Sequence, residues 1–315
     1  MTELPTGYLL RRPMDEDAEG ILKLLIACDL EDEGHPDSTL EDVKADWDMP
    51  RFDRERDSWI VVGPDRDIVG YAWAWDRGPH VDVQADVHVG PSLRSGPIGE
   101  ALLGHVETRA REHVTAAPRG AAVELYLFAK VESVLARLLE SRGYQRVRTF
   151  LRMTIELTKG YPAPFTPPGI DIAPFRRGED ERALQEVIED AFADHFRFAA
   201  EPHEEWVARR VGHPEFDADL WLLARDGEKV VGGILPYPFG QLGWVRELGV
   251  RSGWRGRGIG KALLLQTFRT FDERGWKMVS LGVDAANASG ATKLYQDMGM
   301  FVEERHDLYL LLVRP

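Results

Sequence analysis

Residues 244–262, WVRELGVRSGWRGRGIGKA, decide how this chain is organised. Apolar residues at Trp244, Leu248 and Val250 predict a strand that stops at a basic, glycine-rich turn. The turn opens into residues 259–271, where apolar side chains recur at helical spacing. A strand that feeds a glycine turn at a helix N-terminus directs unpaired N–H groups and the positive end of the helix dipole at one point. The stretch therefore predicts a phosphate or pyrophosphate site.

The spacing of the glycines distinguishes between the known phosphate loops. A nucleoside-triphosphate loop requires GxxxxGK followed by Ser or Thr, but Lys261 is followed by Ala262. A dinucleotide loop requires GxGxxG, but its third glycine would fall at Lys261. The pattern that fits is Arg-x-x-Gly-x-Gly, formed by Arg255, Gly258 and Gly260.

This pattern, with a strand before it and a helix after it, resembles the acetyl-CoA loop of the GNAT (GCN5-related N-acetyltransferase) family. Residues 280–300, SLGVDAANASGATKLYQDMGM, are similar to the family's later acetyl-CoA segment: a strand, then Asn287 at the head of a short helix that ends near Gly299. The resemblance implies that the two strands splay apart with pantetheine between them. It implies acetyl-CoA contacts from Leu248, Gly249, Val250, Arg255, Gly256, Arg257, Gly258, Ile259, Gly260, Lys261, Asn287 and Tyr295.

Acylation of an amine defines the other groups that such a site needs. Alkylamines are mostly protonated at neutral pH, so the site requires a base, an oxyanion donor and an acid for the departing thiolate. The resemblance implies Tyr295 as the acid and a backbone N–H near Val250 as the oxyanion donor; the alternative for Tyr295 is a core residue of an amphipathic helix. Glu247 is the candidate base, and its alternative is a solvent-facing residue or an ion pair with Arg246 or Arg251. Weaker candidates are Asp284 and His306.

The chain contains an internal duplication. Trp59 aligns with Trp221 at an offset of 221 − 59 = 162, and Val89 aligns with Val250 at an offset of 250 − 89 = 161. Later, residues 125–143 align with residues 281–299 at an offset of 299 − 143 = 156. Three nearly constant offsets in the same order predict two copies of one fold.

The predicted domains are residues 1–157 and residues 170–315, joined by a linker at 158–169 that contains four prolines and two glycines. The resemblance implies the α/β (α+β) fold class, with two tandem GNAT domains. Each is expected to be a mixed, mostly antiparallel, splayed sheet flanked by helices. The two-copy layout is similar to that of the mycothiol synthases within this family.

The two copies differ at the positions that matter for acetyl-CoA. Superposing the loops places Arg94 on Arg255 but Pro97 on Gly258, and proline has no N–H to offer a pyrophosphate. In the later segment Leu139 stands where the second copy has Tyr295. We therefore expect an active C-terminal domain and a degenerate N-terminal one. The alternative is a first copy that binds CoA without turnover.

Composition restricts the classes of partner. A net charge of −14 at pH 7 argues against nucleic acid, and no apolar run approaches the roughly 18 residues that a membrane span needs. The N-terminus lacks a signal-peptide pattern, and Cys28 is the single cysteine, so we expect a reducing, cytoplasmic location. His80, Asp82, Asp86 and His88 alternate as on one strand face, but no cysteine joins them, and we expect no metal site.

The predicted function is an acetyl-CoA-dependent N-acetyltransferase that acts on a primary amine of a small molecule. The acetyl group is expected to move by direct attack in a ternary complex, in a monomer or homodimer. One alternative is an aminoacyl-tRNA-dependent transferase on the same tandem fold, which the acidic composition opposes. The other alternative is a non-catalytic CoA sensor.

Overall fold

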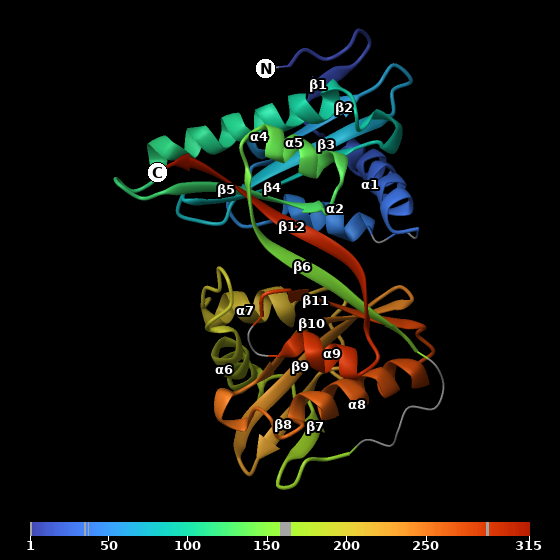
Figure 1. Cartoon of the computed structure of the whole chain (residues 1–315), viewed down its shortest axis with the longest axis vertical. Helices are drawn as coiled ribbons and strands as arrows, with labels where there is room; N and C mark the ends of the chain where they lie inside the picture. Colours follow the sequence, from blue (N-terminus) through green and yellow to red (C-terminus); the bar gives the residue numbers. More distant parts are fainter. Residues whose placement is uncertain (1, 35, 37, 158–164, 288–289) are drawn as a thin grey trace. The chain divides into compact units, whose positions relative to one another are not determined.

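The computed structural model describes residues 2–34, 36, 38–157, 165–287 and 290–315. The chain forms two compact units, one made of Met1–Arg148 with His306–Pro315 and the other of Thr149–Arg305 (Figure 1). Most of the predicted linker, residues 158–164, lies outside the described residues. Within the described part of the chain, no helix has the length and apolar character needed to span a bilayer.

The first unit contains six of the described strands, hydrogen-bonded in the order β1-β2-β3-β4-β5-β12. Its strands are β1 (Leu9–Arg11), β2 (Ser58–Val62), β3 (Ile68–Asp76), β4 (Asp82–Val89), β5 (Val123–Lys130) and the last part of β12 (Phe301–Arg314). Its helices are η1 (Asp15–Asp17), α1 (Ala18–Asp32), α2 (Leu40–Trp47), α3 (Arg54–Asp57), η2 (Pro91–Leu93), α4 (Pro97–Ala116) and α5 (Val134–Ser141).

Helices cover both faces of this sheet because its strands are apolar on both sides. Trp59 and Val61 of β2 belong to the core that α4 and α5 complete. Between them, Ile60 belongs to a second core, which α1 and α2 complete on the opposite face. Successive side chains of a strand point to opposite faces, so this alternation fixes the helix–sheet–helix layering.

The second unit repeats the plan, in the strand order β6-β11-β10-β9-β8-β7. Its strands are β6 (Gln145–Glu156), β7 (Asp171–Pro174), β8 (Leu222–Asp226), β9 (Lys229–Phe239), β10 (Leu242–Val250) and β11 (Met278–Asp284). Its helices are α6 (Glu181–Phe192), α7 (His203–Arg210), η3 (Ser252–Trp254), α8 (Ile259–Glu273) and α9 (Ala291–Asp297). Gly232 of β9 faces Ile259 of α8, and the next residue, Gly233, faces Leu184 of α6, so these helices lie on opposite faces.

Each unit takes its last strand from the other half of the sequence. The end of β12 pairs antiparallel with β5 of the first unit, for example Leu310 with Tyr126. The corresponding position beside β11 is filled by β6, from Met278 opposite Glu156 to Asp284 opposite Phe150. The compact units therefore differ from the predicted division at residues 157 and 170. An alternating pattern predicts that a strand forms but does not specify its partner.

Candidate active site

The feature that builds the site is the point where β10 and β11 separate. These neighbouring strands pair in parallel from Leu242 opposite Met278 to Val245 opposite Leu281, and the ladder ends there. Both strands continue, β10 to Val250 and β11 to Asp284. Beyond the last pair, the N–H and C=O groups of β10 that would otherwise bond to β11 face the gap between the two strands.

A bulge in β10 lies at the same place. The antiparallel register between β10 and β9 shifts between Val245 and Glu247, so Arg246 has no partner in the β9 ladder. A bulge bends a strand and re-aims its side chains. The gap that results is a cavity of about 430 Å³ between the two strands, the α8 loop and α9.

The floor of the cavity is the glycine loop before α8. Gly256 and Gly258 have φ values of 76° and 82°, a left-handed conformation that favours glycine. Gly258 is the N-cap of α8 and has no side chain to satisfy the helix, and the first intrahelical bond comes from the Ala262 N–H to the Gly258 carbonyl. The N–H groups before Ala262 therefore lack intrahelical partners, and with the helix dipole they form an anion site.

Three cationic side chains belong to this loop and the first turn of α8, and each has a different role. Arg255 donates to the carbonyl of Val250 at 3.1 Å and to that of Ala191 at 3.1 Å, so it ties the loop to β10 and α6. Lys261 lines the cavity. The Arg257 guanidinium lies over the Trp254 ring, 5.9 Å from its centre.

Most of the residues that the resemblance implies for acetyl-CoA meet at this cavity. Its lining includes Leu248, Val250, Arg255, Gly256, Gly258, Ile259, Gly260, Lys261, Asn287 and Tyr295. Gly249 does not line the cavity. A Cβ atom at this position would point at Ala191 and Ile188 on α6. Arg257 and Glu247 are also outside the lining.

Tyr295 reaches the cavity from α9. The predicted short helix exists, but it begins at Ala291 with Gly290 as its N-cap, so Asn287 lies in the loop before it. Tyr295 is 7% exposed, and burial raises the pKa of its hydroxyl to about 12. The phenol is therefore protonated throughout the neutral range.

Glu247, the predicted base, is held in an ion-pair network. Its two carboxylate oxygens accept from Nε and Nη2 of Arg210, on α7, at 3.0 and 2.7 Å. Arg210 also binds Glu201 at 2.5 Å through Nη1. The alternative of an ion pair is therefore the observed arrangement, although its partner is Arg210 instead of Arg246 or Arg251.

His195 is a cavity residue that the sequence reasoning did not single out. It lies just after α6, its ring centre is 4.2 Å from that of Phe192, and its Nε2 lies 3.5 Å from Nδ2 of Asn287. Burial lowers the pKa of its imidazole, with a smaller opposing effect from Asp284. A lone histidine outside any motif carries no sequence signal.

Of the weaker candidates, Asp284 lines this cavity and His306 lies in the first unit.

The first unit has the same gap without the same loop. Its parallel strands β4 and β5 also stop pairing part-way, at Ala85 opposite Leu127, and a cavity of about 240 Å³ lies beyond. There, α4 begins at Pro97 after Gly96, whose φ is −99°. Arg94, the counterpart of Arg255, makes a two-pronged ion pair with Asp32 at 2.6 Å for each contact. The cradle of free N–H groups is thus reduced by Pro97.

Comparison with known proteins identifies the family of this chain. The sequence profile of the acetyltransferase (GNAT) family matches residues 19–128 and again residues 182–300. The chain belongs to the GNAT acetyltransferase family. The two matches confirm the tandem GNAT organisation predicted from the duplication, and this GNAT protein is an acetyltransferase, from a family that uses acetyl-CoA.

Individual relatives match most or nearly all of the chain. The mycothiol acetyltransferase of Catenulispora acidiphila is 28% identical over 326 residues, which cover 99% of this GNAT chain and all of that protein. The mycothiol acetyltransferase of Streptomyces scabiei is 30% identical over 259 residues, covering 81% and 80% of the two chains. Among solved structures, a GCN5-related N-acetyltransferase from Sphaerobacter thermophilus has a TM-score of 0.84 and 34% identity, and covers 99% of this chain and 98% of that one. A tandem GNAT protein of the clavulanic acid pathway, 16% identical with a TM-score of 0.74, shares the fold.

Proposed function

We propose that this protein transfers the acetyl group of acetyl-CoA to a primary amine of a small molecule, and that the reaction takes place in the cavity of the second unit. The observation that carries the proposal is the convergence there of three features. They are the β10–β11 gap, the free N–H groups of α8 and the protonated hydroxyl of Tyr295.

Three features of the cavity support a CoA thioester as its ligand. The α8 N-terminus with Lys261 offers an anion site for the diphosphate. The unpaired edge of β10 beyond Val245 offers N–H and C=O groups to the amides of pantetheine, as in the pairing of an extended peptide with a sheet edge. A volume of about 430 Å³ lies in the range usual for small-molecule sites.

Tyr295 is the group that we expect to donate a hydrogen bond to the departing thiolate. Its raised pKa keeps a proton on the hydroxyl, and a thiolate of ordinary pKa is stabilised by a hydrogen bond from it as the carbon–sulfur bond breaks. A main-chain N–H of residues 246–250 is the donor we assign to the oxyanion, since these residues stand beside the bulge.

The base has two candidates. Glu247 remains the prediction from sequence, but both oxygens of its carboxylate already accept hydrogen bonds from Arg210, and the residue does not line the cavity. His195 lines the cavity, and its lowered pKa leaves the imidazole neutral at neutral pH, which is the form that accepts a proton. The geometry therefore favours His195 as the proton acceptor, either directly or through water.

The names of the relatives suggest the first acceptor to test. Two of them are called mycothiol acetyltransferase, so the deacetylated form of mycothiol is the leading candidate amine. The acidic net charge favours cationic amines in general. The cytoplasmic location, the monomeric or dimeric state and the absence of nucleic-acid partners stay predictions of the sequence.

The decisive assay measures CoA thiol release from acetyl-CoA with a panel of amines that includes deacetylated mycothiol. Turnover that depends on both substrates, and that initial-rate patterns assign to a ternary complex, is the expected result. A protein that binds acetyl-CoA but releases thiol with none of the amines would support the CoA-sensor alternative. A ping-pong pattern would contradict direct attack.

A further inference from the structure

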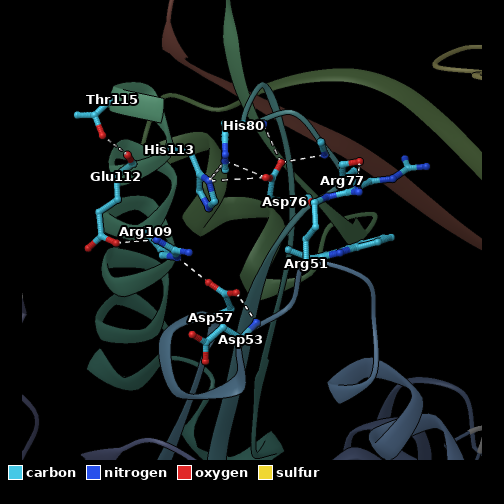
Figure 2. Close-up of polar contacts among 12 residues, drawn as sticks. Arg51, Asp53, Asp57, Asp76, Arg77, His80, Arg109, Glu112, His113 and Thr115 are labelled. Carbon is cyan, nitrogen blue, oxygen red and sulfur yellow. Dashed lines mark hydrogen bonds and ion pairs between the residues drawn. The ribbon is translucent and has the colours of Figure 1, made fainter. Parts of the chain in front are cut away.

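A second cluster of reactive side chains lies in the first unit, at the end of β3 and α4. Asp76 is the last residue of β3, His80 belongs to the turn that leads to β4, and His113 lies in the last turn of α4. Figure 2 shows the three side chains pointing toward one another. Asp76 and His113 are 3% and 4% exposed, whereas the His80 side chain is 42% exposed. The cluster is thus buried on one side and open to solvent on the other.

The position of His80 differs from the one that the sequence pattern predicts. The pattern places it on one strand face with Asp82, Asp86 and His88, but β4 begins only at Asp82, and His80 lies before it with a φ of 67°. His88 pairs instead with Asp86, at 3.1 Å. The turn therefore takes His80 away from that face and brings it to Asp76 and His113.

Three potential ligand atoms face one another within the cluster. Nδ1 of His80 is 2.9 Å from Oδ2 of Asp76 and 3.0 Å from Nδ1 of His113, and Nδ1 of His113 is 4.0 Å from the same Oδ2. Two nitrogens and a carboxylate oxygen are good ligands for a transition-metal ion. Tetrahedral ligands at the usual zinc distances lie about 3.3 Å apart, and the three separations are distributed around that value.

Protons alone satisfy this arrangement poorly. A proton on Nδ1 of His80 that points at Asp76 cannot also lie on the line to Nδ1 of His113. If the proton is instead on Nδ1 of His113 and points at Nδ1 of His80, the His80 nitrogen must accept it. The lone pair of that nitrogen then lies close to the negatively charged Oδ2 of Asp76, which is unfavourable. A cation bound by all three atoms removes the conflict at Nδ1.

The backbone holds the carboxylate in place for such a role. Oδ1 of Asp76 accepts from the N–H groups of Gly78 and His80 at 2.8 and 3.0 Å, which leaves Oδ2 for the two histidines. His80 has a left-handed backbone with a φ of 67°, a conformation that histidine adopts more readily than most non-glycine residues.

The nearby arginine is already neutralised. Arg109, one turn before His113 on α4, binds Asp57 at 2.5 Å and Glu112 at 2.8 Å (Figure 2). The ion pairs of the Asp76 carboxylate within the described residues are those with His80 and His113. No arginine or lysine in the described part of the chain therefore pairs with this carboxylate.

We propose that Asp76, His80 and His113 bind one divalent transition-metal ion, with Zn²⁺ the best match to two imidazoles and a carboxylate. The ion would tie the β3–β4 turn to the end of α4 and keep an open coordination position on the solvent side of His80. None of the three residues lines the cavity of the second unit, so the ion acts on the first unit and not on acetyl transfer.

The test uses the full-length, untagged protein. It is stripped with a chelator, equilibrated with Zn²⁺, dialysed into metal-free buffer and analysed for zinc by mass spectrometry. We expect one equivalent per chain. We expect His80→Ala to weaken binding at least about 100-fold in competition with a chromogenic chelator, because loss of even an outer partner of a metal ligand costs about 10- to 100-fold.

The matched control is His105→Ala, a histidine on the same helix, α4, outside the cluster. Zn²⁺ should raise the midpoint of thermal unfolding for the wild type and for this control, but not for His80→Ala. His80 is half-exposed, so its removal tests the site without emptying the core. Less than a tenth of an equivalent in the wild type, or equal zinc affinity in His80→Ala, would overturn the proposal.

Discussion

Val245 and Leu281 are the last paired positions of the parallel ladder between β10 and β11, and the cavity opens directly beyond them. Ala85 and Leu127 hold the same place between β4 and β5 in the first unit. Both copies therefore build a splayed pair of strands. What distinguishes them is the loop that follows, with Gly258 at the head of α8 and Pro97 at the head of α4.

The first prediction concerns the left-handed N-cap of α8. Gly258→Ala should weaken acetyl-CoA binding about 5- to 30-fold, because a side chain at its φ of 82° costs about 1–2 kcal/mol and the loop would relax away from the bound geometry. Titration calorimetry with acetyl-CoA measures the change. The control is Gly240→Ala in the β9–β10 turn, where φ is also positive at 55°. Equal losses in both variants would mean that general strain, and not the loop, sets the affinity.

The second prediction assigns the acid. Tyr295→Phe should lower kcat by about 10²-fold, the lower end of the usual contribution of a positioned proton donor, with acetyl-CoA affinity little changed. Steady-state kinetics and calorimetry measure the two quantities separately. Tyr309→Phe, which removes a hydroxyl that binds Glu140 in the first unit at 3.0 Å, should leave kcat unchanged. An unaltered rate in Tyr295→Phe would remove that residue from the mechanism.

The third prediction is a pH profile. Burial disfavours the imidazolium, so the pKa of His195 lies below 6.5, and a base that must be neutral loses activity only below that pKa. We expect kcat/KM to fall on the acid side of pH 6.5 and to show no basic limb from Tyr295 until pH approaches about 12. In His195→Gln the acid limb should disappear along with most of the rate. A limb that persists in that variant would belong to another group.

The fourth prediction separates the two candidate bases. Glu247→Ala leaves Arg210, which is 8% exposed, with Glu201 as its remaining partner in the network. We expect a loss of about 3 kcal/mol in the free energy of unfolding, the low end for a broken buried pair, measured by urea denaturation. Turnover of the folded variant should stay within about tenfold of the wild type. A loss of more than about 100-fold with normal stability would identify Glu247 as the base.

Local signals in the sequence were enough to predict the strand, the glycine loop and the helix that form residues 242–273. The glycines before Ile259 require backbone conformations that other residues avoid, so their spacing carries the information directly. The helix after them and the strand before them follow from periodicity. The same holds for Pro97, whose missing N–H can be read without a structure.

Contacts between distant residues could not be predicted in this way. Glu247 meets Arg210, and Asp76 meets His113; in each case the two residues are 37 positions apart, and only the tertiary fold brings them together. The partner of the last strand could not be predicted for the same reason. The pattern of an apolar strand is compatible with pairing to either neighbouring strand, β5 or β11. His195 follows α6 without any motif around it.

Calorimetric titration of the full chain with acetyl-CoA tests the central proposal most directly. We expect one binding site per chain in the wild type, kept in Arg94→Ala and abolished in Gly258→Val, because a β-branched residue at a φ of 82° cannot preserve the loop. Two sites per chain, or binding that survives Gly258→Val and disappears in Arg94→Ala, would place acetyl-CoA in the first unit and contradict the assignment.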